Sequence, residues 1–152
     1  MEPQPTIVRR TLPPPLPSGD ELSVSMAAMQ DALTTAGSDS AWVERVRVAL
    51  GALAADFRVQ AGAAQEPDGT HHRVLRAEPR LSKAVVDQVR EQDQLATAID
   101  DLLAYLDGRP AASGVTDVRD QGRALMGRLV RHRQGGSDLL HEVDEADLGG
   151  EG

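Results

Sequence analysis

The chain has 152 residues and an apolar fraction of 40%, enough for one globular domain with its own core. Its formal net charge of -8 argues against sequence-independent nucleic-acid binding and against binding to acidic membranes, since both need a basic surface. The absence of cysteine excludes disulfides, thiolate metal sites and cysteine nucleophiles. The apolar residues are mainly alanine, leucine and valine, with only 2% aromatics, so we expect an all-α protein.

Proline dominates the first seventeen residues of the chain. Proline lacks the amide hydrogen that helices and sheets need, so residues 1–17 are predicted to be a disordered tail, with a polyproline ligand as the alternative. Residues 18–148 are expected to form the folded bundle, and residues 149–152 a frayed C-terminus. No segment approaches the roughly 20 apolar residues of a membrane span, so we expect a cytoplasmic protein.

Apolar residues recur at alternating spacings of three and four in four segments, the pattern of amphipathic helices. The predicted helices cover residues 20–36, 40–65 and 80–107, and a fourth follows Thr116. Residues 70–78 are predicted to be a connector with at most one helical turn. Each glycine inside the fourth helix costs about 1 kcal/mol relative to alanine. A kink or restart at residues 135–137 therefore stays open. Four such helices predict an antiparallel up-down four-helix bundle.

Three predicted helices carry one polar residue within the apolar stripe: Gln60, Gln92 and His132. Buried amides and imidazoles need hydrogen-bond partners, or they serve a ligand. At about 1.5 Å per residue, Gln92 and His132 fall at a similar depth of the bundle, while Gln60 lies nearer the end of its helix. We interpret His132 as a core histidine bonded to Gln92 or to a backbone carbonyl, with a role as mononuclear metal ligand as the alternative.

The other histidines and the carboxylates are expected on the surface. His71 and His72 follow a turn, where adjacent histidines are usually solvated, and His141 precedes Glu145 by four residues and can pair with it. No Ser-His-Asp arrangement has a recognisable context, and no cleft is indicated that would separate the pKa values of an acid/base pair. The protein is therefore not expected to be an enzyme.

Residues 131–142, RHRQGGSDLLHE, together with the acidic end that follows, resemble the C-terminal helix of bacterial hemerythrin-like (HHE-type) bundle proteins. Residues 56–57 and the turn at 67–69 are similar to the end of the second helix of that family and the turn after it. The likeness covers roughly residues 40–151. It implies a four-helix bundle that holds two non-haem irons with histidines and carboxylates and binds dioxygen or related small molecules.

Several ligand positions of the family carry different residues here. At the positions that match the pattern, the chain has Gln60, Gln65, Glu91, Gln92, His132 and Asp138. Amides replace two histidines and one acid, and an amide is a poor iron ligand beside imidazole and carboxylate. Asp138 follows His132 by six residues where five are usual, so its carboxylate is expected to point away. His132, Asp138 and Glu91 are the remaining candidate metal ligands, in a site that we expect to be degenerate.

The sequence thus predicts a hemerythrin-like bundle that acts as a non-catalytic binding or interaction module. No cofactor is expected, and iron only if the metal site is functional. The partner is an unidentified protein or small ligand, and the chain is a monomer or a homodimer. Two alternatives stay open: a non-haem iron protein that binds dioxygen or nitric oxide, and a helical adaptor that uses its proline-rich tail as a tether to a protein partner.

Overall fold

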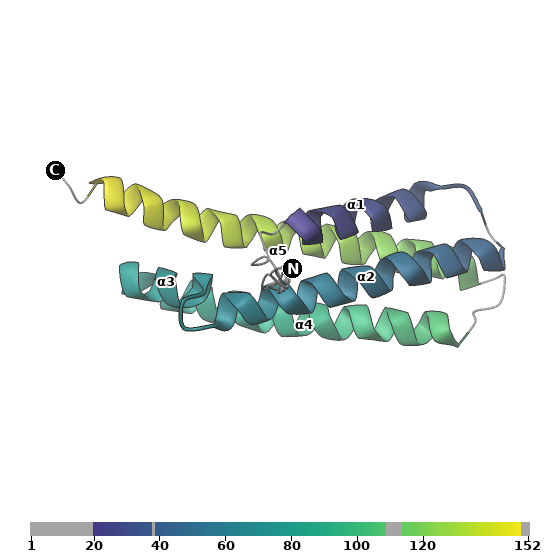
Figure 1. Ribbon diagram of the computed structural model, residues 1–152, viewed down its shortest axis with the longest axis horizontal. Helices are drawn as coiled ribbons and strands as arrows, with labels where there is room; N and C mark the ends of the chain where they lie inside the picture. The colour runs from purple at the N-terminus through teal and green to yellow at the C-terminus, as the bar shows by residue number, and fades with distance from the viewer. Residues whose placement is uncertain (1–19, 38, 109–113, 150–152) are drawn as a thin grey trace, which may run out of the picture.

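The structure is a computed structural model that describes residues 20–37, 39–108 and 114–149 (Figure 1). Among these residues every regular element is helical, which confirms the expected all-α class. In chain order the elements are α1 (Asp20–Thr34), α2 (Ser40–Gln65), α3 (Thr70–Ala77), the 3-10 turn η1 (Pro79–Leu81), α4 (Ser82–Asp107) and α5 (Val115–Gly149). The predicted tail, residues 1–17, lies outside the described residues, as do residues 150–152.

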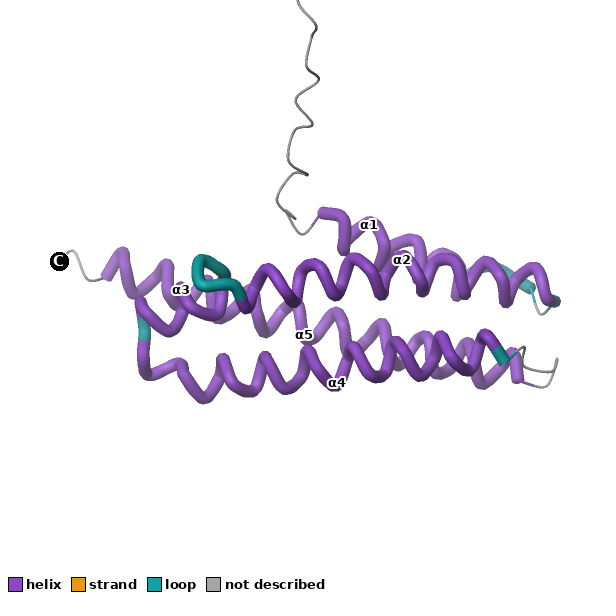
Figure 2. Tube along the Cα trace, turned by 60° about the horizontal axis from the view of Figure 1, so that its bottom comes forward, coloured by secondary structure: helices purple, strands orange, loops and turns teal. Residues whose placement is uncertain are grey.

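The boundaries of α2 follow from local chemistry. Asp39 caps its N-terminus, because the side-chain oxygen accepts a hydrogen bond from the Trp42 amide at 2.9 Å. The helix ends before Pro67, and a tight turn leads directly into α3 (Figure 2). A Cβ at Gly69 would lie 2.2 Å from the carbonyl oxygen of Ala63, so only glycine fits this turn.

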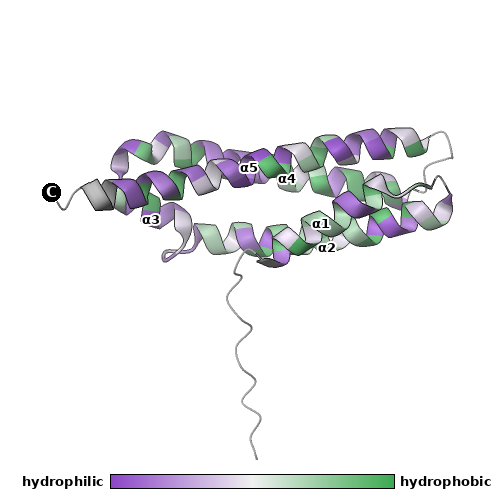
Figure 3. Ribbon diagram, turned by 90° about the horizontal axis from the view of Figure 1, so that it is seen from above, coloured by the Kyte–Doolittle hydropathy of each residue, from purple (hydrophilic) through white to green (hydrophobic). Residues whose placement is uncertain are grey.

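The helices bury apolar side chains against one another. Figure 3 shows hydrophobic and hydrophilic residues interspersed along the helices. α1 and α4 each pack against both α2 and α5, so four helices surround one main core. That core includes Trp42, Leu50, Leu53, Leu95 and Leu129, all 0% exposed. A second, smaller core joins α3, η1, the start of α4 and the end of α5 through Val74, Leu81, Val85 and Val143. No helix among the described residues combines the length and the apolar character that crossing a membrane requires.

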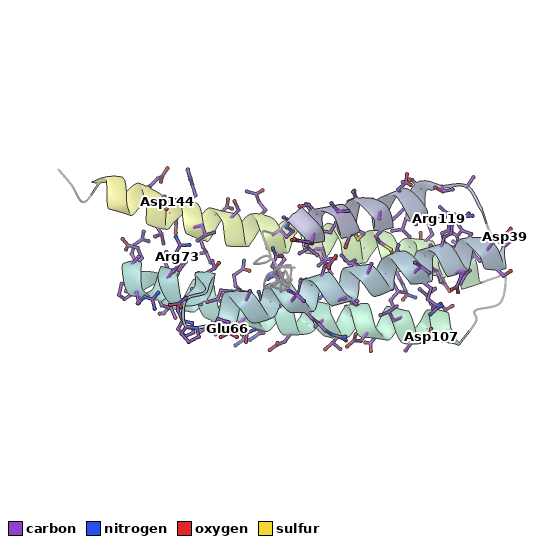
Figure 4. The ribbon with its side chains drawn as sticks, in the orientation of Figure 1. Asp39, Glu66, Arg73, Asp107, Arg119 and Asp144 are labelled. Carbon is purple, nitrogen blue, oxygen red and sulfur yellow. The ribbon has the colours of Figure 1, made fainter. Side chains whose placement is uncertain are left out.

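The helices differ in length, and for this reason α5 contacts α1 only along part of its length. α1 has 15 residues and α5 has 35. Arg119 donates hydrogen bonds to the carbonyl groups of Leu33, near the end of α1, and of Gly37, beyond its end, and Arg133 donates to Ser23 near its start. Figure 4 labels Arg119 near the end of α1. Beyond these contacts, the second half of α5 packs on α3 and α4 (Figure 1).

α5 continues as one helix through Gly135 and Gly136, which decides the question that the sequence left open. The side chain of Gln88 on α4 lies against this point, and its Nε2 donates to the carbonyl oxygen of His132 at 3.5 Å. A Cβ at Gly135 would stand 2.5 Å from that nitrogen. The glycine therefore allows a side chain of α4 to reach the backbone of α5, and the helix is not interrupted.

Residues 70–78 differ from the sequence prediction of a connector with at most one helical turn. Residues 70–77 form α3, a helix of two turns, and η1 follows it. The physical reason is the second core, because Val74 on α3 is 1% exposed and needs a helical segment that presents it to α4 and α5.

Candidate functional site

The polar centre of the bundle comprises Glu91, Gln92 and His132, and it is built around a bonded pair between α4 and α5. The Nδ1 atom of His132 lies 2.5 Å from Oε1 of Glu91, and since a carboxylate accepts, the imidazole donates. His132 is 6% exposed, whereas the side chain of Glu91 is 47% exposed and reaches solvent. The ring of Phe57 lies beside the imidazole, with ring centroids 6.2 Å apart and planes tilted by 57°. These contacts from three helices fix the orientation of the imidazole.

Gln92 has a different partner from the one that the sequence suggested. It is 8% exposed, and its Oε1 accepts a hydrogen bond from Nε2 of Gln65 at 3.3 Å. The prediction that His132 bonds Gln92 or a backbone carbonyl is therefore wrong. Consecutive residues on an α-helix point about 100° apart, so Glu91 faces α5 while Gln92 faces the end of α2.

Gln60 was expected within the buried stripe, but it is only partly buried. α1 begins at Asp20, five residues before Ser25, whose hydroxyl donates to Asp56 of α2. Gln60 lies one turn beyond Asp56 and thus near the edge of the surface that α1 covers. The polar centre therefore contains Gln92 and His132 from the predicted seam, and not a buried Gln60.

His71 corrects the expectation that both histidines of the pair at 71–72 are solvated. It is only 8% exposed, on the face of α3 that also buries Val74, and its Nδ1 has no hydrogen-bond partner among the described residues. Burial lowers the pKa of His71, and nearby His132 and then His72 lower it further. The spacing of His71, Val74 and Leu75 at three and four residues was the signal that could have predicted this burial.

The exposed histidines behave as the sequence predicted. His72 is exposed, and its Nδ1 lies 3.0 Å from the carbonyl oxygen of Glu66, which Figure 4 labels at the end of α2. His141 pairs with Glu145 on the surface of α5 at 3.1 Å. Among the described residues, neither His72 nor His141 bonds a residue of the polar centre. His71 and His132 are therefore the two histidines to consider for a functional site.

Asp138, the third predicted metal ligand, is not brought to His132. It is exposed, and one of its carboxylate oxygens accepts a hydrogen bond from Nε2 of Gln134 at 2.8 Å on the same helix. The six-residue spacing from His132 thus directs Asp138 away, as expected. In the part of the chain that the structure describes, no group of three histidine, cysteine or acidic side chains is placed to hold a metal ion.

A groove of about 370 Å³ runs beside the pair, between α4 and α5. Its walls are acidic, since Asp87, Glu91, Asp138 and Glu142 all line it. Glu91 therefore has two environments: one carboxylate oxygen bonds the buried imidazole, and the side chain is also part of a solvent-exposed wall. This arrangement can attract a cation to the groove, but no second acid is bonded to the same histidine among the described residues.

Comparisons with protein-family models, with curated proteins and with solved structures found no match for this chain.

Proposed function

We propose that the chain is a hemerythrin-like, antiparallel up-down bundle that acts as a non-catalytic binding or interaction module. The contacts of α1 support the antiparallel arrangement. Ser23, near the start of α1, bonds Arg133, whereas Leu33, near its end, bonds Arg119, so residue numbers increase in opposite directions along the two helices. The same holds for α1 and α2, where Ser25 bonds Asp56 and Ala32 bonds Trp42.

The observation that carries this proposal is the bond of 2.5 Å between His132 and Glu91. Both residues were candidate metal ligands, and here each satisfies the other. The neighbouring amides of Gln65 and Gln92 also bond each other, where the family pattern expects an acid and a histidine. A layer of mutually bonded side chains stabilises the centre without an ion, and its donor set does not fit two irons, which need several more imidazoles and carboxylates.

One observation favours a second candidate, a mononuclear metal or small-ligand site. The buried Nδ1 of His71 has no partner among the described residues, and an unsatisfied buried group of this kind costs about 1 to 3 kcal/mol. Such groups call for an explanation, and one explanation is a ligand that is bound in the working protein. His71 would then supply one imidazole, a donor that suits iron or zinc. Because no three donor side chains among the described residues are already placed around one point, this candidate requires His132 or Glu91 to move toward His71 on binding. This candidate corresponds to a protein that binds dioxygen or nitric oxide.

Metal analysis of protein purified without a histidine tag, together with its absorption spectrum, separates the two candidates. The proposal expects well under one equivalent of iron and no visible ligand-to-metal bands. His71→Leu and His132→Leu test the second candidate, and His72→Ala is the matched control, because His72 is exposed and adjacent. Stoichiometric metal that is retained in His72→Ala and lost in the other two variants would overturn the proposal and establish the mononuclear site.

A further inference from the structure

One exposed stripe runs along most of α5, and one of its members, Asp138, also borders the groove between α4 and α5. Its members share one face of the helix, because they recur at intervals of three and four residues, with Val130 and Arg131 adjacent: Arg123, Gly127, Val130, Arg131, Gln134, Asp138, His141 and Glu145. All of them are exposed except Gly127, which is partly buried. The charge changes sign along this stripe. Its first half carries arginines and its second half carries acids.

The basic half of the stripe borders an apolar groove between α1 and α5, with a volume of about 440 Å³. Leu33 and Met126 form its buried floor, and Val130 stands in its wall with 48% of its surface exposed. A Cβ at Gly127 would meet only Nη1 of Arg131, at 3.6 Å, so the glycine leaves open space beside the floor.

Two arginines flank this groove. Arg123 and Arg131 both line it, and neither has an acidic partner in the part of the chain that the structure describes. They lie eight residues apart on α5, which corresponds to about 12 Å along the helix. The surface therefore combines exposed apolar area with two unpaired positive charges, which together fit an acidic amphipathic helix.

The acidic half of the same stripe has the complementary properties. Asp138 bonds Gln134, and Glu145 bonds His141, so each acid contacts a neighbour on its own helix. α1 does not extend along this part of α5, since its last recorded contact there is the bond from Arg133 to Ser23. Among the described residues, the acidic half is thus a helix surface that is open to a partner.

We propose that a second copy of this chain occupies the groove, with the two α5 helices antiparallel and the acidic half of each lying against the basic half of the other. This inference rests on the proposed function as an interaction module and names its partner. A two-fold axis at Gln134 places Arg123 opposite Glu145, because each lies eleven residues from the axis. It places Arg131 within one residue, about 1.5 Å, of the position opposite Asp138. The stripe is therefore self-complementary, as a symmetric dimer interface must be.

Because the whole chain is acidic, dimerisation depends on the local charge pairs between the two stripes. Two copies that each carry a formal charge of -8 repel at long range, so association depends on the short-range pairs and on covering Val130 and the groove. Ion pairs between exposed side chains weaken as salt screens them. The dimer is accordingly expected to loosen in concentrated salt once the pairs are screened, but also to need moderate salt to damp the long-range repulsion.

Charge reversal tests the interface, with mass measured by light scattering after size exclusion and by sedimentation equilibrium. The first variant combines Arg123→Glu with Arg131→Glu, and the second combines Asp138→Arg with Glu145→Arg. Each variant alone presents a stripe of one sign and is expected to be monomeric. An equal mixture of the two restores complementary stripes and is expected to form a heterodimer, whereas wild type forms a homodimer.

A control variant changes the same charge elsewhere. Arg128 is on α5 but lines a different groove, between α4 and α5, so Arg128→Glu together with Arg90→Glu on α4 should leave the dimer intact. Far-UV spectra verify that every variant is helical. If a double reversal fails to fold, the neutral substitutions Arg131→Gln and Asp138→Asn replace it, and each should weaken dimerisation about tenfold, because each removes two symmetric pairs.

Several results would overturn this inference. They are a wild-type protein that stays monomeric at every concentration tested, folded variants that remain dimeric, or a mixture of the two reversed variants that stays monomeric. These outcomes leave the question of the metal centre untouched, because metal content is measured independently and none of the reversed residues bonds His132 or His71. Failure of the dimer is thus distinguishable from failure of the proposed function.

Discussion

The bond between His132 and Glu91 makes a quantitative prediction about which residues of the polar centre are coupled. We consider two double-mutant cycles that share His132→Leu. The first pairs this substitution with Glu91→Ala, and the second pairs it with Gln92→Ala. Glu91 and Gln92 are consecutive on α4, but only Glu91 bonds the imidazole, whereas Gln92 bonds Gln65. The second cycle is therefore a control that differs from the first by one position on the same helix.

The expected magnitudes follow from burial. A hydrogen bond to a charged group contributes about 1.5 to 3 kcal/mol to stability. Because 47% of the Glu91 side chain is exposed, water screens the bond and we expect a coupling energy of about 1 to 2 kcal/mol. His132→Leu alone should change stability by less than about 1 kcal/mol, since the lost bond is offset by leucine buried beside Phe57. The cycle with Gln92 should give a coupling energy below about 0.5 kcal/mol, because no bond is shared.

The assay is equilibrium unfolding in urea at neutral pH, followed by far-UV circular dichroism, with all variants at the same protein concentration. A larger coupling of His132 with Gln92 than with Glu91 would refute the assignment of partners. Additive effects in both cycles would instead show that the imidazole is bonded to neither side chain.

Three further predictions concern stability. Acidification should destabilise the protein, because the buried His71 has a pKa below its usual 6.5 and the unfolded chain therefore binds that proton more readily. The stability contributed by neutral His71 is present above pH 6.5 and is lost as the pH falls from 6.5 through the lowered pKa. In His71→Leu, the loss of stability on acidification should be smaller. A pH profile of stability identical to that of wild type would contradict this cause. Gly122→Ala should destabilise by about 1 to 3 kcal/mol, because its Cβ would stand 2.7 Å from Leu33, whereas Gly127→Ala has space and should stabilise by about 1 kcal/mol; equal effects in urea unfolding would show that the packing at these positions is misjudged. Arg119→Met should cost about 1 to 2 kcal/mol, because the carbonyl groups of Leu33 and Gly37 at and beyond the end of α1 lose their donor, and a variant as stable as wild type would argue against this anchor.

The helical class and most of the helix boundaries could be predicted from the amino-acid sequence. The second helix was expected to follow a cap within residues 38–40 and to end at about residue 65. It is Ser40–Gln65, because Asp39 caps its start and Pro67 follows its end. The apolar stripes were also correct in large part, since residues such as Leu50 and Leu129 are fully buried. Capping, proline and the helical period act within a few residues of the chain, and so their effects can be predicted without knowledge of the neighbouring helices.

Which polar residues meet depends instead on how the helices pack. The sequence placed Gln92 and His132 at one depth, but the rotation of α4 about its own axis directs Glu91 to the imidazole instead. His71 is buried because the second core pulls α3 against α4 and α5, and the start of α1 leaves Gln60 near an edge. Depth along a helix follows from counting residues, whereas its rotation and the reach of its neighbour depend on the packing of side chains from distant segments. That packing is a property of the whole bundle, and for this reason the partner of His132 could not be predicted from the sequence alone.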